Sequence, residues 1–252
     1  MNDIYLSLVI PAFNEEKRLS LTLNSIYAYF MNEDFYWEVI VVDDGSSDQT
    51  STVAESFKQV IPSIQLIRND ANHGKGYSIR QGIAKARGSV IGFMDADYKT
   101  PIEEIEKFLP ALVAGYDIVI GSRGLPGART EYPVSWHRLI GSRVFGIIMH
   151  VIVGLRDISD TQCGFKFFRK EIALDLFARQ ILNGYMFDVE ILYLAEKSGY
   201  SIKQIPIRWM FDPDSRLRLI RGNMANMLEL FRIRMNHYPE PILCGTSSDK
   251  QI

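Results

Sequence analysis

Short apolar runs that end abruptly in carboxylates recur in the first half of this chain. One run, VIVV, is followed by Asp43 and Asp44, and another, VIGFM, is followed by Asp95 and Asp97. Unbroken apolar runs of this length are typical of strands buried on both faces of a parallel sheet. Ligands of open α/β sheets bind beyond the carboxyl ends of such strands. The sequence therefore predicts one crevice at a sheet edge that both acidic strand ends share.

Predicted strands and helices alternate along this half of the chain. The strands are expected at residues 6–11, 38–43, 64–68, 89–94 and 117–121, and the helices at residues 15–30, 47–57, 75–87 and 101–113. Polar cap residues, and a proline at the first turn of the last helix, mark helix starts. This β-α order predicts an α/β domain with a Rossmann-like, mainly parallel sheet and helices on both faces.

The second half of the chain is less regular. Arg143 and His150 interrupt an otherwise apolar segment at 139–155, so we expect burial or partial insertion at a bilayer surface rather than a membrane span. The remaining predictions are a glycine- and proline-rich loop at 121–136, strands at 164–169 and 201–208, a helix at 187–197 and an arginine-containing helical stretch at 217–238.

Composition and the N-terminal residues narrow the class of protein. A formal net charge of −2 argues against nucleic acid as the main partner. Cys163 and Cys244 show neither zinc-site spacing nor a disulfide framework, which favours a reducing compartment. The first residues lack the basic start and long apolar run of a signal peptide. We therefore expect a cytoplasmic protein with one large α/β domain, and its oligomeric state stays open.

The acidic strand ends favour a divalent cation. Asp95 and Asp97 suit Mg²⁺ or Mn²⁺, because hard cations prefer oxygen ligands and share them with substrate phosphates. Asn14 and Glu15 follow the first strand, and the segment NHGKG offers glycines for close backbone approach and Lys75 for a phosphate. Each motif alone also fits a capped turn or an ordinary helix start. Their occurrence together is far more specific than any one of them.

Motifs spread over most of the chain carry a resemblance to a known family. They are VIPAFNEE, VVDDGSSD, NHGKG, MDAD, GSR at 121–123, DTQCGFKFF at 160–168 and FDVEILYLA at 187–195. With them the chain resembles the family 2 glycosyltransferases with the GT-A fold. Within that family it is similar to dolichyl-phosphate β-glucosyltransferases and, more loosely, to dolichyl-phosphate mannose synthases. The resemblance implies transfer of a hexose from a nucleoside diphosphate to a polyprenyl phosphate, with inversion at the anomeric carbon.

The resemblance also implies roles for the donor-binding residues. Asp95 and Asp97 would bind the metal. Arg216 matches a basic position of the family, where an arginine can grip a phosphate, and a solvated surface charge is the alternative. The residues expected at the nucleotide are Pro11, Ala12, Asn14, Glu15, Asp43 and Asp44 around the uridine, with Gly74 and Lys75 near the base or the diphosphate.

The acceptor decides whether the enzyme needs a base. Arg123 and Arg138 are the candidates for the acceptor phosphate, with solvated loop positions as the alternative. A lipid monophosphate has a second pKa of about 6 and attacks largely as a dianion, whereas a hydroxyl group needs a carboxylate base. Asp160 would orient the acceptor or the sugar, or act as that base. Asp188 and Glu190 are a second acidic option, with helix-start acids as the alternative.

Departures from the family leave the acceptor and the donor open. This sequence lacks the membrane anchors of many members, so a water-soluble acceptor is an alternative. A basic C-terminal unit at 216–252, following a catalytic domain at 1–215, would together with 139–155 allow peripheral contact with the cytoplasmic face of an anionic membrane. Lys99 stands near the place of a neutral metal contact in mannose synthases, which weakens the case for GDP-mannose.

Three other classes of protein fit less well. A phosphatase of the haloacid-dehalogenase type expects its Asp-x-Asp on the first strand and a threonine where this chain has Lys99. A nicotinamide enzyme is disfavoured because no G-x-G-x-x-G motif follows a predicted strand in this chain. A non-catalytic sugar-nucleotide-binding protein is the third alternative. The sequence thus predicts a metal-dependent, inverting hexosyltransferase with UDP-glucose as donor and polyprenyl phosphate as acceptor, and GDP-mannose or another nucleotide sugar as alternative donors.

Overall fold

A seven-stranded sheet in the order β3-β2-β1-β4-β7-β5-β8 forms the centre of the protein. The computed structural model describes residues 3–130, 146, 151–210 and 221–242. A second, two-stranded sheet pairs β6 with β9. The strands are β1 Leu6–Ala12, β2 Trp37–Asp43, β3 Ile64–Arg68, β4 Val90–Met94, β5 Ile118–Ser122, β6 Arg129–Thr130, β7 Phe165–Arg169, β8 Ile202–Pro206 and β9 Arg208–Trp209.

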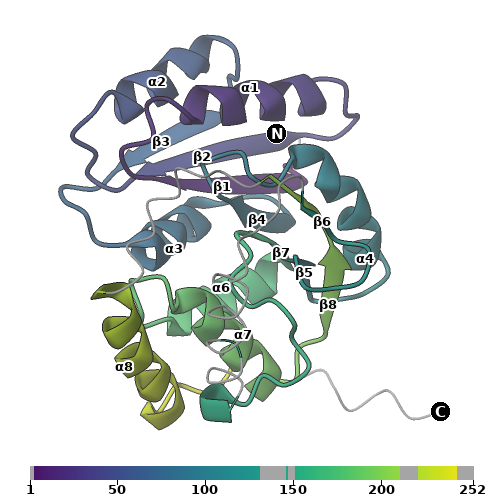
Figure 1. The fold of residues 1–252 in the computed structure, drawn as a ribbon. Coiled ribbons are helices and arrows are strands. Elements are labelled where there is room, and N and C mark those ends of the chain that lie inside the picture. The colour runs from purple at the N-terminus through teal and green to yellow at the C-terminus, as the bar shows by residue number, and fades with distance from the viewer. Residues whose placement is uncertain (1–2, 131–145, 147–150, 211–220, 243–252) are drawn as a thin grey trace.

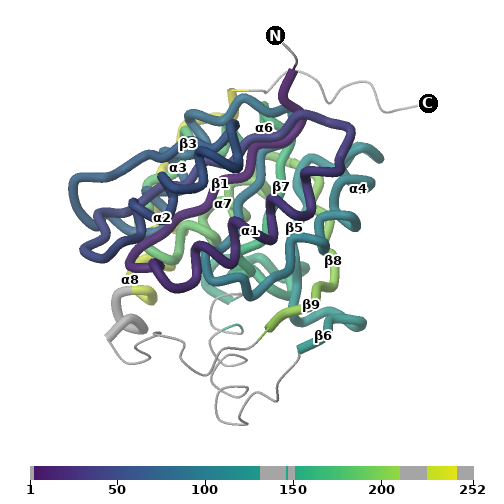
Figure 2. The backbone as a smooth tube through the Cα atoms, turned by 90° about the horizontal axis from the view of Figure 1, so that it is seen from above, coloured from purple at the N-terminus to yellow at the C-terminus, as the bar shows by residue number. Residues whose placement is uncertain are grey.

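Helices cover both faces of the large sheet, as predicted from the sequence (Figures 1 and 2). They are α1 Leu19–Phe30, α2 Thr50–Ser56, α3 Lys75–Lys85, α4 Leu109–Val113, α6 Lys170–Arg179, α7 Phe187–Lys197 and α8 Arg221–Met235, with the 3₁₀ helices η1 Phe57–Gln59 and η2 Ile102–Lys107. Leu8 and Ile10 of β1 belong to one hydrophobic cluster, with residues of α1, α2 and η2. Val9 belongs to the other, with residues of α3, α6, α7 and α8.

Strand β7 runs opposite to its neighbours. β1 is parallel to β2 and β4, and β5 is parallel to β8. β7 lies between β4 and β5 and is antiparallel to both, with Phe93 of β4 opposite Lys166. The sheet is therefore mainly parallel with one reversed strand. Helix α6, which was not predicted from the sequence, follows β7 directly, whereas α7 has its predicted bounds.

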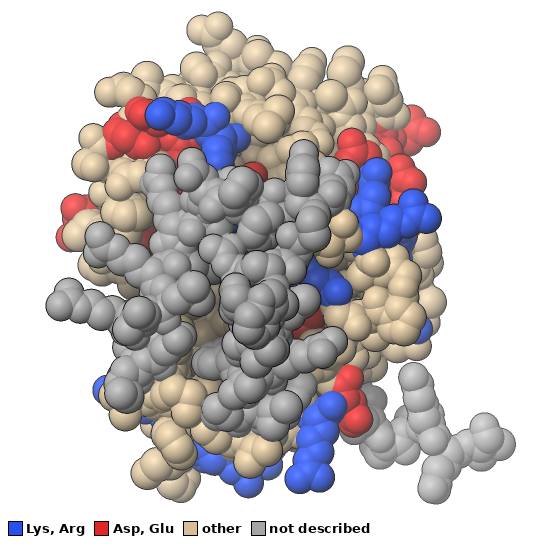
Figure 3. Space-filling model, viewed as in Figure 1, with Lys and Arg blue, Asp and Glu red and all other residues tan. Residues whose placement is uncertain are grey.

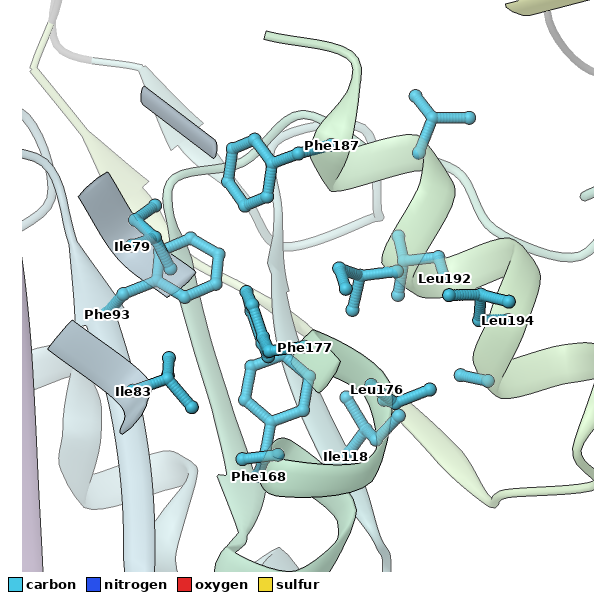
Figure 4. Packing of buried hydrophobic residues seen from close by; sticks show 14 of the residues in the cluster. Ile79, Ile83, Phe93, Ile118, Phe168, Leu176, Phe177, Phe187, Leu192 and Leu194 are labelled. Carbon is cyan, nitrogen blue, oxygen red and sulfur yellow. The ribbon is translucent and has the colours of Figure 1, made fainter. Parts of the chain in front are cut away.

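Aromatic side chains tie β7 and the helices after it to β4 (Figure 4). The ring centre of Phe93 lies 6.2 Å from that of Phe168 in β7 and 5.7 Å from that of Phe187 in α7. Phe177 of α6 meets Phe168 edge-on, with 5.7 Å between ring centres. Burying one such side chain stabilises a fold by about 1.5–3 kcal/mol. This cluster therefore stabilises the second half of the chain against the first.

Several predicted elements differ at their ends. The helix predicted at 15–30 begins at Leu19, because Asn14 has a left-handed φ of 54° and the next residues form turns. The helix predicted at 101–113 consists of η2 and then α4. Pro110 at the start of α4 has no backbone N–H to continue the preceding helix. The strand predicted at 201–208 divides into β8 and β9.

The two least regular segments of the sequence are described only in part. β6 lies within the loop predicted at 121–136, and residues 131–145 and 147–150 are outside the described ranges. Of the apolar segment 139–155, Val153 and Leu155 are buried in the cluster that α6 and α7 form. Among the helices of the described residues, none has the length and hydropathy needed to cross a bilayer.

Charges of both signs are interspersed on the surface. On the face shown in Figure 3, lysine and arginine side chains lie in small groups next to aspartate and glutamate. The described residues of this face form no broad basic area, in line with the net charge of −2.

Candidate active site

The strand ends that carry the predicted motifs meet at one edge of the sheet. β1 and β2 end side by side, with Ala12 opposite Asp43, and β4 ends at Met94, directly before Asp95. Helix α3 begins beside them with Lys75, whose ammonium nitrogen lies 2.6 Å from a carboxylate oxygen of Asp95. The Asp-x-Asp and NHGKG motifs therefore form one site.

Both carboxylates of the Asp-x-Asp motif face lysines. Besides the pair of Asp95 with Lys75, Asp97 lies 2.6 Å from the ammonium nitrogen of Lys99. Burial alone would lower the pKa of Lys75, but the carboxylates of Asp95 and Asp188 outweigh burial and raise that pKa. A lysine side chain therefore lies next to each carboxylate of the Asp-x-Asp motif.

The Asp-x-Asp loop is held in a strained conformation. Tyr98 has a left-handed φ of 55°, a state that costs a bulky residue about 1–3 kcal/mol. Two side chains of α1 hold the loop: Thr22 donates to the carbonyl of residue 96 at 2.7 Å, and Ser25 donates to the Tyr98 hydroxyl at 2.9 Å. The backbone N–H of Met210 donates to the carbonyl of Lys99 at 2.8 Å. Two distant segments thus fix the loop.

Gly164 of the DTQCGFK motif makes room for Asp95. A Cβ atom at residue 164 would lie 2.1 Å from the Oδ2 atom of Asp95, so a side chain here would displace the Asp95 carboxylate. The backbone N–H of Asp95 donates to the carbonyl of Gly164 at 3.2 Å. The role of Gly164 was not predicted from the sequence, although a glycine beside a strand is a sign of close approach.

Arg123 and Asp160 form a two-pronged ion pair. The Nε and Nη2 atoms of Arg123 lie 2.7 and 2.9 Å from the carboxylate oxygens of Asp160, and the backbone N–H of Arg123 donates to the same carboxylate at 3.0 Å. Burial would raise the pKa of Asp160, but the guanidinium group outweighs burial and lowers that pKa. Asp160 is therefore ionised and already paired, which makes it a weak base at neutral pH.

A cleft joins the Asp-x-Asp loop to this ion pair. Trp209 of β9 lies on its wall, 5.3 Å from the guanidinium carbon of Arg123 to the ring centre. The cleft is lined by residues of four segments, among them Asp95, Lys99, Arg123, Gln162 and Trp209. The predicted metal ligand Asp95 and the predicted acceptor ligand Arg123 therefore face the same space.

A buried ion pair that was not predicted from the sequence lies next to the site. Lys166 of β7 is fully buried and lies 2.5 Å from Asp188 of α7. Burial raises the pKa of Asp188, against the opposite effects of Lys166 and Lys75. Glu190 accepts backbone N–H groups of residues 181 and 182 and a tyrosine hydroxyl of residue 238. These partners give Asp188 and Glu190 structural roles; a lysine inside the apolar run GFKFF was the one sign of this pair.

The residues expected around the uridine lie at the ends of β1 and β2. Asn14 accepts the backbone N–H of Ser47 at 2.9 Å, and Glu15 forms an ion pair with Arg18 at 2.6 Å. Pro11 and Ala12 are the last residues of β1. The residues that line a second cleft here include Asn14, Glu15, Arg18, Ser47 and Asp48.

Asp43 and Asp44 are buried and hold the turns that surround this region. Asp44 accepts the side-chain amide of Asn69 at 2.8 Å and the backbone N–H groups of His73 and Gly74 at 3.0 and 2.8 Å. Asp43 accepts the backbone N–H of residue 46 at 2.9 Å. Because a carboxylate has about four acceptor positions, these three hydrogen bonds use most of the acceptor capacity of Asp44.

Two of the predicted phosphate-binding arginines are not placed by the structure, and the cysteine of the DTQCGFK motif is packed. Arg138 and Arg216 lie outside the described residues, so the structure does not place them. Cys163 is buried, and burial raises the pKa of its thiol to about 12, which leaves a packed, unreactive side chain.

The donors at this edge suit a metal that shares its coordination shell with a ligand. In the part of the chain that the structure describes, no group of three or more His, Cys, Asp or Glu side chains could hold a metal ion by itself. Asp95 and Asp97 offer carboxylate oxygens, and Gly164 leaves space at Asp95. Mg²⁺ is often held by one or two carboxylates together with substrate phosphates and water. The pair therefore fits a divalent cation that binds with a phosphorylated ligand.

Solved structures with the GT-A fold share the architecture of this protein. The mannosyl-3-phosphoglycerate synthase from Rubrobacter xylanophilus aligns with a TM-score of 0.66 and 19% identity, over 91% of this chain and 72% of that chain. The glucosyl-3-phosphoglycerate synthase from Mycobacterium tuberculosis, in complex with Mn²⁺ and UDP-glucose, aligns with a TM-score of 0.64 and 18% identity, over 91% and 77%. The shared fold confirms the predicted fold class.

The chain belongs to glycosyl transferase family 2, whose pattern matches residues 7–177. A dolichyl-phosphate beta-glucosyltransferase of Trichomonas vaginalis is 34% identical over 92% of this chain and 71% of the relative. Enzymes of the same name from Saccharomyces cerevisiae and Homo sapiens are 33% and 35% identical, over 92% and 84% of this chain and 75% and 69% of those proteins. The predicted family is therefore confirmed, and the protein is a glycosyltransferase.

Proposed function

We propose that this glycosyltransferase moves glucose from UDP-glucose to a polyprenyl phosphate, with inversion at the anomeric carbon and with Mg²⁺ or Mn²⁺ held by Asp95 and Asp97. The observation that carries the proposal is the cleft lined by Asp95, Lys99 and Arg123, because it offers cations for phosphorylated ligands beside a metal-type carboxylate. The name shared by the relatives supports the sugar and the class of acceptor.

On the donor side, we propose that the nucleotide lies across the ends of β1 and β2. Lys75 binds the diphosphate, and Arg216 adds a second phosphate contact. When bound, the metal neutralises the charge that develops on the departing diphosphate. The residues proposed to hold the uridine and the adjoining turn are Pro11, Ala12, Asn14, Glu15, Asp43, Asp44 and Gly74.

On the acceptor side, Arg123 and Arg138 bind the phosphate of the lipid. Two N–H groups of the Arg123 guanidinium face Asp160, which leaves three for an acceptor. Asp160 acts by positioning Arg123, since its lowered pKa makes it a weak base. A phosphate dianion needs no base, whereas a hydroxyl acceptor would. The paired state of Asp160 therefore favours the lipid phosphate over a soluble hydroxyl acceptor.

The donor and acceptor are tested by calorimetric titration with UDP, GDP, UDP-glucose and GDP-mannose, each with and without Mn²⁺, followed by turnover with a short polyprenyl phosphate. We expect Mn²⁺-dependent preference for the uridine ligands and a lipid-linked glucose product. Preference for the guanosine ligands would replace glucose by mannose as the proposed sugar. Nucleotide binding without lipid product would argue for a soluble acceptor, and binding without any turnover for a non-catalytic protein.

We further propose that the catalytic domain, residues 1–215, is followed by a membrane-contacting unit at 216–252. Leu230 and Ile233 of α8 are buried against the rest of the protein. The rest of the described surface of α8 exposes apolar side chains at helical spacing together with basic ones, a pattern typical of helices that lie on anionic membranes. The exposed residues are Leu228, Phe231 and Met235, and Arg232 and Arg234.

Reversing the charges at Arg232 and Arg234 to Glu is expected to weaken binding to anionic vesicles at least tenfold, because each basic residue near such a surface contributes about 1 kcal/mol. Vesicle sedimentation with phosphatidylserine, compared with neutral phosphatidylcholine, measures the effect. Lys58→Glu/Lys85→Glu, at exposed positions of η1 and α3, is the matched control. Equal binding by the α8 variant and the wild type would refute membrane contact through α8.

A further inference from the structure

Both carboxylates of the Asp-x-Asp motif are occupied by lysines of the same chain. Lys75 lies 2.6 Å from Asp95, and Lys99 lies 2.6 Å from Asp97. The side chains of Lys75, Lys99 and Asp97 are 16, 18 and 16% exposed, and that of Asp95 is 41% exposed. Salt and water screen such partly buried pairs much less than pairs on an open surface. A cation that approaches either carboxylate therefore meets an ammonium group that is already paired with one of its oxygens.

The ion pairs around the cleft sum to zero charge. Among the residues that the structure describes, four carboxylates around the cleft each have a cationic partner within 2.7 Å. The pairs are Asp95 with Lys75, Asp97 with Lys99, Asp160 with Arg123 and Asp188 with Lys166. A surface lined by one sign of charge attracts the opposite ion, but these balanced pairs offer little net attraction to a free divalent cation.

Lys99 competes with a metal ion for Asp97, but Lys99 cannot itself act as a metal ligand. An ammonium group has donors but no acceptor lone pair, so Lys99 cannot bind a metal ion itself. Thr22, Ser25 and Met210 hold the loop that carries Lys99, so the backbone of Lys99 is held close to Asp97. Lys75 is similarly placed as the first residue of α3.

We propose that Lys75 and Lys99 are exchangeable counter-ions, which pair with the Asp-x-Asp carboxylates before the donor binds and move to the phosphates when a nucleoside diphosphate enters with a divalent cation. The inference rests on the proposed function, which supplies the nucleoside diphosphate. Exchange leaves each charge paired in both states, which avoids the cost of an unpaired buried charge. The cation and the nucleotide then bind as a coupled pair, each raising the affinity for the other by the same factor.

The coupling is measured by electron paramagnetic resonance, which reports free Mn²⁺. The protein is titrated with Mn²⁺ alone and with saturating UDP, with correction for the Mn²⁺–UDP complex in solution. We expect UDP to tighten Mn²⁺ binding at least tenfold. Lys99→Met removes the ammonium group and adds no oxygen ligand, so it should bind Mn²⁺ alone at least tenfold more tightly than the wild type and show a smaller coupling factor. Lys99→Gln should bind Mn²⁺ at least as tightly.

Lys58→Met is the matched control, because Lys58 pairs with Glu55 on the surface, where both side chains are 49% exposed. It should keep the wild-type values. Unchanged Mn²⁺ affinity in a folded Lys99→Met variant would overturn the proposed exchange. Tighter Mn²⁺ binding by Lys99→Gln but not by Lys99→Met would also overturn it, because the glutamine would then act as an added metal ligand. If Lys99→Met does not fold, Lys75→Met tests the same competition at Asp95.

The test separates this inference from the proposed function. If neither UDP nor GDP binds, the proposed donor class fails. The titration of Lys99→Met with Mn²⁺ in the absence of nucleotide still decides whether Lys99 competes with a cation for Asp97.

Discussion

Asp97→Ala is expected to lower metal-dependent sugar transfer about 10³-fold, because a bound cation supplies several kcal/mol of charge stabilisation to the leaving group and about 1.36 kcal/mol corresponds to a factor of ten. Asp97 is the proposed metal ligand that follows β4, and among the described residues its ion-pair partner is Lys99. The aromatic cluster around Phe93 does not include this side chain. The variant should therefore remain folded.

Transfer of labelled glucose at saturating Mn²⁺ measures the loss of activity, and circular dichroism with thermal melting measures the fold. Glu55→Ala removes an acid from a surface ion pair and is the matched control. Full activity of the Asp97→Ala variant would eliminate Asp97 as a metal ligand. A collapse of the melting transition would instead attribute the loss to unfolding.

Lys166→Met is expected to lower the free energy of unfolding by about 3–5 kcal/mol, because it leaves the buried carboxylate of Asp188 without its partner. Urea denaturation measures the change. Lys166→Met/Asp188→Leu should recover most of the loss, since apolar side chains often replace a buried ion pair at little cost. Lys58→Met, at an exposed site, should stay within about 0.5 kcal/mol of the wild type. A single variant as stable as the wild type would show that the pair contributes nothing.

The cost of Lys166→Met should also depend on pH. Burial raises the pKa of Asp188 and Lys166 opposes that rise, so removing Lys166 raises this pKa further. A carboxyl group with a raised folded-state pKa stabilises the fold fully below its unfolded pKa, about 3.9, and this contribution is lost as pH rises through the folded-state pKa. The difference in stability between variant and wild type should therefore be smaller near pH 5 than near pH 8. Equal differences would exclude the charge of Asp188 as the cause.

The parallel part of the sheet could be predicted because its signals are local. Apolar runs end in polar residues at β1, β2 and β4, and each intervening segment is long enough for a helix. The direction of β7 has no such signal. The segment GFKFF is typical of a strand in either orientation, and the segment between β5 and β7 is long enough to connect to a parallel or an antiparallel strand. Helix α6 did carry a helical pattern, with Ile172, Ala173, Leu176 and Phe177 on one buried face.

The positions of the site motifs could be predicted, but their ion pairs could not. Asp160 forms an ion pair with Arg123, 37 residues away in the sequence, and Lys166 forms one with Asp188, 22 residues away. A lysine such as Lys99 carries no sequence mark that distinguishes a surface charge from a partner of Asp97. Partner choice depends on which segments the tertiary fold brings together, and here the reversed strand β7 brings Lys166 next to the strand ends of the first half.

The place of β7 between β4 and β5 also constrains the growing chain during translation. β5 ends at Ser122 and β7 begins at Phe165, and ribosomes add roughly 5–20 residues per second. The edge of β4 that pairs with β7 therefore stays unpaired for on the order of several seconds during synthesis. During that interval the nascent chain exposes an unpaired strand edge that includes Ile91 and Phe93. Unpaired edges of this kind can pair with strands of other chains. This exposure lasts from the completion of β4 at Met94 until the ribosome has passed Arg169, the last residue of β7.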